Sequence, residues 1–295
     1  SPAHASFCER VYGRTLCQHG FADMEQLDKL IEVARLGPSD RALDLEKTES
    51  RQLRLTLQYA LAGERKESES THAVTVIEKH GMTWEEPGRI GLYVTHLDEA
   101  VERFARDTVR GFRDDERGAI VYDNLLRAME LFDALAAHGV RYVPDPENPY
   151  GGIVPGRPVL DTVRLPRETL RLRTGDCDDL AMLYAALLQN IGIDTAVVDL
   201  YDHVLVMFDT GLTARSLGQL ARDPGLLHVD TLGRVWVPVE VTMVGKSFSD
   251  AWEAAAATLA RRRHTVIEIK EAWKKYSPLR PREPAPDIVA PPAAE

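Results

Sequence analysis

The stretch Thr174-Gly175-Asp176-Cys177-Asp178-Asp179 decides the fold of this chain, because it begins a helix that has to be buried. Beyond it, apolar side chains recur every three or four positions, at Leu180, Ala181, Tyr184, Leu187, Leu188 and Ile191. Gly192 ends the pattern. Thr174 or Asp176 can supply the N-cap oxygen that the first free amides need. We therefore expect a largely buried helix with Cys177 in its first turn.

Two predicted strands follow this helix. Residues Thr195 to Leu200 are β-branched and apolar, Tyr201-Asp202 reads as a turn, and His203 opens the apolar run Val204 to Phe208. His203 is therefore expected at the start of a strand that pairs with the one before it.

A second hairpin is predicted further along. Residues Leu227 to Asp230 and Arg234 to Val241 alternate around Gly233, with Glu240 near the end of the second strand. The predicted fold class is α+β: a helix that bears a cysteine packs on an antiparallel sheet that bears a histidine and a glutamate.

Position gives Cys177 a specific chemistry. A thiol in the first turn of a helix feels the positive end of the helix dipole, which favours the nucleophilic thiolate. The neighbouring acids Asp178 and Asp179 act in the opposite direction. The sulfur therefore needs an imidazole close by, and His203 is the candidate.

The order of these residues resembles the transglutaminase-like superfamily, whose members share a papain-like core. Its members read Gly-Asp-Cys-x-Asp before a Leu-rich helix, then a histidine that opens a strand, then Trp-x-Pro-x-Asp-x-Thr. Here the corresponding stretches are Gly175 to Asp179, His203-Val204 and Trp236-Val237-Pro238-Val239-Glu240-Val241-Thr242. The resemblance covers roughly Val121 to Trp273. Departures are Glu240 for Asp, Val241 for Pro, and an insertion between the His strand and the acid strand.

The resemblance implies a catalytic triad of Cys177 as nucleophile, His203 as general base and Glu240 as the orienting carboxylate. It implies a cysteine peptidase, amidase or transglutaminase-type acyltransferase that acts on a peptide, protein or peptidoglycan-like substrate through a thioester acyl-enzyme. The backbone N–H of Cys177 would be one oxyanion donor, and the loop Tyr142 to Tyr150 could supply a second. Asp179 is expected to be a structural acceptor. The alternative is a non-catalytic binding module of the same shape in a larger bacterial assembly.

Four segments are predicted along the chain. Residues 1–45 form an N-terminal helical segment, residues 46–97 a small β-rich module, residues 98–277 the transglutaminase-like domain, and residues 278–295 a Pro-rich tail that is disordered or extended.

Inside these segments the pattern predicts particular elements. In the β-rich module we expect strands at residues 54–60, 72–77 and 90–94, with a loop at 63–67. Helices are expected at residues 98–110 and 120–138, the second ended by Gly139.

Residues Phe7 to Leu45 look like the lead-in to the first strand of a nucleotide-dependent methyltransferase. The sequence continues with Glu46-Lys47-Thr48-Glu49 where such proteins carry glycines. Without glycines the backbone does not approach a cofactor closely. We therefore predict no cofactor.

Composition limits the partners. With 36 Lys and Arg against 46 Asp and Glu, the chain carries a formal charge of −10, which argues against a nucleic-acid partner. No apolar run is long enough to predict a membrane span. Cys8 and Cys17 do not match a common zinc spacing, so no metal is predicted. The resemblance allows the cell envelope or periplasm, the sequence also allows the cytoplasm, and it assigns no oligomeric state.

Overall fold

A computed structural model describes residues 45, 47–61, 64–110, 123–144, 160–281, 283–288 and 290–291. The chain divides into two compact units, residues 1–44 and 45–295, and the described residues belong to the second. The predicted N-terminal helix, the methyltransferase-like lead-in, Cys8 and Cys17 lie outside the described residues, as does the start of the helix expected at residue 120.

A long β-hairpin opens the described part. Strands β1 (Glu49–Leu61) and β2 (Glu64–Val76) pair antiparallel, from Glu49 opposite Val76 to Leu61 opposite Glu64. The predicted hairpin is confirmed, but the predicted loop at residues 63–67 is wrong, because residues 64–67 belong to β2. Arg65 and Glu67 are exposed there, so charged side chains are compatible with the backbone ladder.

The third strand predicted at residues 90–94 is also wrong. Residues Pro87–Leu92 form the 3-10 helix η2, with Tyr93 N–H donating to Ile90 O at 3.0 Å. Pro87 in the first turn favours a helical start, and the apolar residues that mimicked a strand are buried by this turn instead. Strand β3 (Gly81–Thr83) pairs with β5 (Leu160–Thr162).

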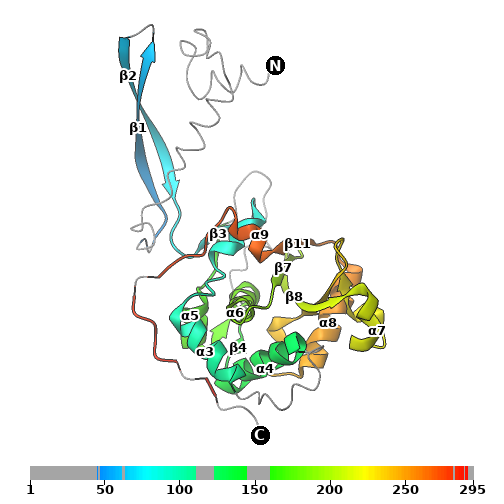
Figure 1. Cartoon of the computed structure of the whole chain (residues 1–295). Helices are drawn as coiled ribbons and strands as arrows, with labels where there is room; N and C mark the ends of the chain where they lie inside the picture. Colours follow the sequence, from blue (N-terminus) through cyan, green and yellow to red (C-terminus); the bar gives the residue numbers. More distant parts are fainter. Residues whose placement is uncertain are drawn as a thin grey trace. The chain divides into compact units, whose positions relative to one another are not determined.

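Within the described residues, four α-helices precede the main sheet. They are α3 (Glu99–Val109), α4 (Asp123–His138), α5 (Pro166–Leu172) and α6 (Cys177–Asn190). As predicted, α3 starts after Asp98, whose side chain accepts from Ala100 N–H, and α4 ends at Gly139, where φ is +90°. Figure 1 shows α6 between α3 and α5 on one side and strands β7 and β8 on the other.

The main sheet has five antiparallel strands in the order β11-β7-β8-β10-β9. Their bounds are β7 Thr195–Asp199, β8 Val204–Thr213, β9 His228–Val229, β10 Arg234–Val239 and β11 Thr265–Glu268. The segment between β8 and β9 contains η6 (Ala214–Ser216), α7 (Leu217–Leu220) and η7 (Pro224–Leu226). The two predicted hairpins and the α+β class are confirmed.

Both faces of this sheet are apolar because each is covered by a helix. Val197, Val206 and Val237 belong to the core that contains α6. The alternate residues Val198 and Met207 pack in a second cluster with helix α8 (Phe248–Arg261). Side chains on a strand alternate between faces, which explains why β7 and β8 read as continuous apolar runs.

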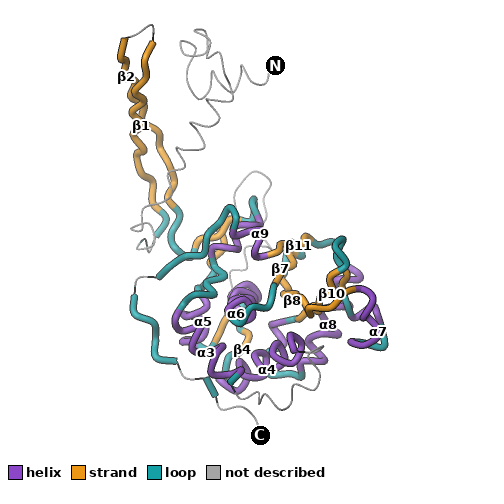
Figure 2. The backbone as a smooth tube through the Cα atoms, in the orientation of Figure 1, coloured by secondary structure: helices purple, strands orange, loops and turns teal. Residues whose placement is uncertain are grey.

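The described residues after Trp273 lie along the domain. After α9 (Ile269–Trp273) the chain continues as loop (Figure 2), and the backbone N–H of Leu279 donates to Leu92 O at 2.8 Å. Ile288 and Ala290 are buried. The described residues of this tail are therefore extended and packed.

Candidate active site

Helix α6 presents Cys177 at its first position. The side chain of Asp176 is the N-cap and accepts from Asp179 N–H at 3.2 Å, so Asp176 fills the role predicted for it or Thr174. The two residues before it form β6 (Thr174–Gly175), which pairs in parallel with β4 (Arg141–Tyr142). Cys177 is partly buried and packs against the main core.

His203 and Glu240 are in direct contact. His203 precedes β8, and Glu240 follows the last residue of β10, which pairs antiparallel with β8 through Val239 opposite Val206. This pairing brings together two residues far apart in sequence, with His203 Nε2 2.7 Å from Glu240 Oε2. Both side chains are mostly buried, at 23% and 12% exposed.

The second oxygen of Glu240 is also held. Oε1 accepts from the Thr242 backbone N–H at 3.2 Å and from the Thr242 hydroxyl at 2.5 Å, at the start of the 3-10 helix η8 (Val241–Met243). An ionised carboxylate only accepts hydrogen bonds, so in a contact with ionised Glu240 the Nε2–H of His203 donates and Nδ1 is left for another partner. The contact fixes the orientation of the imidazole ring.

The sulfur of Cys177 lies against the start of β8, where it receives a backbone hydrogen bond from Val204, the residue after His203. Burial raises the pKa of the Cys177 thiol, and the charges of Asp178 and Asp176 raise it further. The surroundings of the sulfur therefore favour the thiol over the thiolate.

Carboxylates crowd the first turn of α6. Asp178 and Asp161 are 2% and 3% exposed, and burial raises the pKa of both. Oxygens of Asp176, Asp178 and Asp179 lie within 4.8 Å of one another, which is close enough to share a metal ion. Both oxygens of Asp179 already accept from Arg164, at 2.7 and 2.9 Å, which matches the structural role predicted for Asp179. We assign no metal to this cluster.

Three residues near Cys177 were not named in the predicted triad. Asp161 and Arg164 come from the segment before α5, and no local pattern marks them. Tyr142 belongs to the loop from which a second oxyanion donor was expected. Burial raises its pKa, and the charges of Cys177, Asp176 and Glu240 raise it further. Residues 145–150 of that loop lie outside the described residues.

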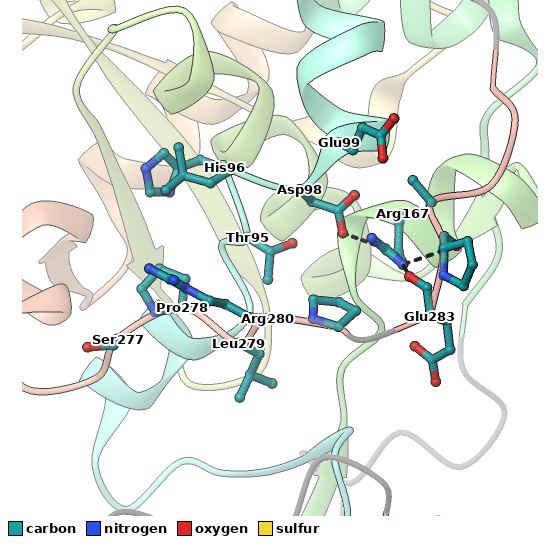
Figure 3. Close-up of a pocket in the computed structure, with 14 residues that line it drawn as sticks. Thr95, His96, Asp98, Glu99, Arg167, Ser277, Pro278, Leu279, Arg280 and Glu283 are labelled. Carbon is teal, nitrogen blue, oxygen red and sulfur yellow. Dashed lines mark hydrogen bonds and ion pairs between the residues drawn. The ribbon is translucent and has the colours of Figure 1, made fainter. Parts of the chain in front are cut away.

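A separate cavity of about 540 Å³ lies between the start of α3 and the tail (Figure 3). It is lined by Thr95, His96 and Arg167 on one side and by tail residues such as Pro278 and Arg280 on the other. His96 stacks on Trp273 with ring centroids 4.2 Å apart. Cys177, His203 and Glu240 do not line this cavity.

Comparison with known proteins does not identify a family for this chain. No protein-family model matches the chain, and no curated protein matches it. One solved structure, described as a putative protease from Parabacteroides distasonis, is similar with a TM-score of 0.28 and 14% identity. The match covers 66% of this chain and 41% of that one, so this chain spans less than half of it. A superposition this loose does not identify an activity. No described helix is long and apolar enough to cross a membrane.

Proposed function

We propose that this chain is a transglutaminase-like cysteine hydrolase or acyltransferase that acts on amide bonds. Cys177 is the nucleophile, His203 the general base and Glu240 the residue that orients the imidazole. The observation that carries the proposal is the 2.7 Å contact between His203 Nε2 and Glu240 Oε2, made beside the strand residue that hydrogen-bonds the Cys177 sulfur.

Burial and the neighbouring carboxylates raise the pKa of the Cys177 thiol, so the thiolate depends on a base that accepts its proton. His203 Nδ1 takes that proton to form a thiolate–imidazolium pair, and the sulfur bonds to the carbonyl carbon of the amide. The carbonyl oxygen becomes an oxyanion, and Glu240 stabilises the imidazolium. When the oxyanion collapses, the C–N bond breaks, and the leaving amine takes the proton back from Nδ1. Water or an amine then releases the acyl group from the thioester.

The first turn of α6 supplies donors for the oxyanion. Asp179 N–H is engaged by Asp176, and Leu180 N–H donates to Asp176 O at 3.2 Å. The amides of Cys177 and Asp178 have no partner among the described residues. Free amides at a helix start are suited to a developing negative charge. The Cys177 N–H is therefore our first oxyanion donor, with the Tyr142 hydroxyl as a candidate for the second.

The substrate class rests on the resemblance: a peptide, a protein or a peptidoglycan-like amide. Hydrolysis and transfer to an amine share the same acyl-enzyme, and they differ in the group that reaches it second.

Selective alkylation tests the proposal. With Cys8→Ser and Cys17→Ser as the parent, we expect iodoacetamide to react only at Cys177, and to do so below pH 7 through a thiolate–imidazolium pair. A plot of alkylation rate against pH should therefore show a low-pH limb, the part below pH 7 where Cys177 still reacts. His203→Gln should lower the alkylation rate on this low-pH limb, and Glu240→Gln should lower it less. A parent that reacts only as fast as free cysteine at every pH would contradict the proposal.

The second candidate is the non-catalytic binding module. The observation that favours it is the raised pKa of the Cys177 thiol among buried acids. In that case alkylation should follow a single high-pH ionisation, and His203→Gln should leave it unchanged.

A further inference from the structure

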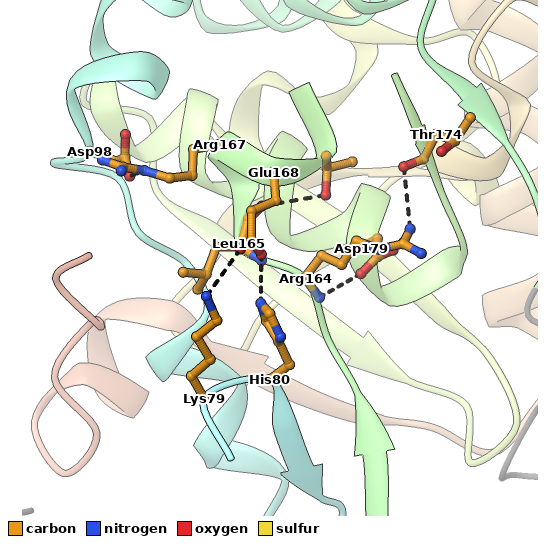
Figure 4. Close-up of polar contacts among 10 residues, drawn as sticks. Lys79, His80, Asp98, Arg164, Leu165, Arg167, Glu168, Thr174 and Asp179 are labelled. Atoms are coloured by element: carbon orange, nitrogen blue, oxygen red, sulfur yellow. Dashed lines mark hydrogen bonds and ion pairs between the residues drawn. The ribbon is translucent and has the colours of Figure 1, made fainter. Parts of the chain in front are cut away.

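Arg164 lies next to the first turn of α6 without belonging to the predicted triad. It sits between β5 and α5, and its backbone N–H donates to Asp179 Oδ1 at 2.7 Å. Its guanidinium donates to Asp179 Oδ2 at 2.9 Å (Figure 4). One residue therefore occupies both oxygens of a carboxylate that is only 3% exposed.

The same guanidinium reaches the segment that precedes the nucleophile. Nη1 of Arg164 lies 3.5 Å from the carbonyl oxygen of Thr174, a longer contact than those to Asp179. Thr174 comes three residues before Cys177 and Asp179 two residues after it. Arg164 thus contacts the chain on both sides of the sulfur.

The turn held in this way is closely packed. A Cβ atom added at Gly175 would lie 2.7 Å from Asp179 Cβ and 3.1 Å from Thr169 Cγ2, so the backbone of β6 and the side chain of Asp179 touch with no room between them. A fully packed turn with both carboxylate oxygens bonded has few alternative arrangements. Cys177 and Asp179 belong to the same first turn of α6, so the packing that holds Asp179 also restricts the backbone at Cys177.

We infer that Arg164 is a positioning residue that holds the Cys177 sulfur in the place where it can react with His203. This inference rests on the proposed function. A planar guanidinium suits the role because it presents several donors in a fixed geometry, whereas a lysine offers a mobile point charge. The backbone bond from Arg164 to Asp179 does not depend on the side chain, so a substitution removes part of the clamp and leaves part in place.

The test compares Arg164→Met and Arg164→Lys in the parent that keeps only Cys177. The control is Arg171→Met, which removes the same charge from an exposed residue of α5 that has no partner within the described part of the chain. Thermal melts first establish that each variant folds. If Arg164→Met does not fold, Arg164→Lys carries the test.

The first measurement is the pH profile of iodoacetamide alkylation at Cys177. The charges of Asp178, Asp176 and Asp161 act on the Cys177 thiol, and the thiol acts on Tyr142. His203 and Glu240 are the partners of the sulfur in the proposed function. All of them are retained in the variants. We expect Arg164→Met to lower the alkylation rate on the low-pH limb, which depends on His203, by about tenfold. This is equivalent to one pKa unit of thiolate stabilisation. Arg164→Lys should lower it less, and Arg171→Met should match the parent. A parent-like limb in Arg164→Met overturns the inference.

The second measurement does not depend on cysteine chemistry. Backbone amide exchange in the peptide spanning residues 174–180 should be about tenfold faster in Arg164→Met than in Arg171→Met, because the clamp raises the free energy of local opening. Unchanged exchange overturns the inference. If the parent shows no low-pH limb, the proposed function fails, while the exchange result still decides whether Arg164 holds the turn.

Discussion

Thr242 donates twice to one oxygen of Glu240, from its backbone N–H at 3.2 Å and from its hydroxyl at 2.5 Å. The other oxygen of Glu240 is thereby left for His203 Nε2, 2.7 Å away. Thr242 is the last residue of the Trp-x-Pro-x-acid-x-Thr stretch. Thr242 holds the carboxylate of Glu240 in this orientation, which gives the last residue of the stretch a structural role.

Removal of this hydroxyl should therefore weaken the site without unfolding the chain. We expect Thr242→Val to lower the alkylation rate of Cys177 at pH 6 by roughly tenfold, the low end of the effect of losing a partner that orients a functional group. The matched control is Thr258→Val, which removes the hydroxyl bond to Ala254 O on the remote helix α8. Equal rates for the two variants would show that the Thr242 hydroxyl does not orient Glu240.

The close approach at Gly175 predicts a stability loss. In Gly175→Ala the new methyl group meets Asp179 Cβ at 2.7 Å, so the backbone before Cys177 has to shift. We expect the free energy of unfolding to fall by about 1–3 kcal/mol, as for overpacking elsewhere. Gly218→Ala is the control, because nothing lies within 4 Å of its added Cβ. Urea denaturation measures both, and a Gly175→Ala variant as stable as Gly218→Ala would be inconsistent with this packing.

Burial of Asp178 predicts how stability changes with pH. Burial raises the pKa of Asp178 well above its usual value, and the neighbouring Asp176 raises it further. The folded chain then keeps a proton that the unfolded chain loses near pH 4, so this contribution to stability is full below that pH and is lost as the pH rises. We expect Asp178→Asn to reduce the loss of unfolding free energy between pH 5 and 8 by about 1 kcal/mol or more.

Urea denaturation at both pH values measures this difference. Glu168 acts in the opposite direction, since its pKa is lowered to about 2, where the hydrogen bond and charge of His80 outweigh burial. Its contribution is lost only as the pH falls below about 4.5, outside the window used. The exposed Asp250→Asn is the control, and equal pH slopes for the two variants would refute the prediction.

The tail should contribute to stability through Arg167. This buried residue pairs with Asp98 and donates to the tail carbonyl oxygen of Glu283 at 2.8 Å (Figure 3). Removal of every residue after Tyr276 exposes the pair and the sites that bury Ile288 and Ala290. We expect a loss of about 2 kcal/mol of unfolding free energy, seen as a lower Tm. An unchanged Tm after this deletion would mean that the tail does not stabilise the domain.

Local signals predicted most elements of the domain. The apolar spacing in α6, the cap at Asp176 and the glycines at residues 139 and 233 depend on neighbours within one or two turns. The same rules failed at η2, where a short apolar run read as a strand. Alternation over so few residues does not separate a strand from a buried turn. The identity of the triad stays a prediction from the resemblance.

The sequence by itself determined that a cysteine begins a buried helix and that a histidine and a glutamate flank strands, because capping and periodicity are local. Only the tertiary structure decided that β10 pairs with β8 in the register that puts Glu240 against His203. It also decided that Arg164 occupies both oxygens of Asp179. These contacts join separate elements through strand register and packing, which no short stretch of sequence encodes.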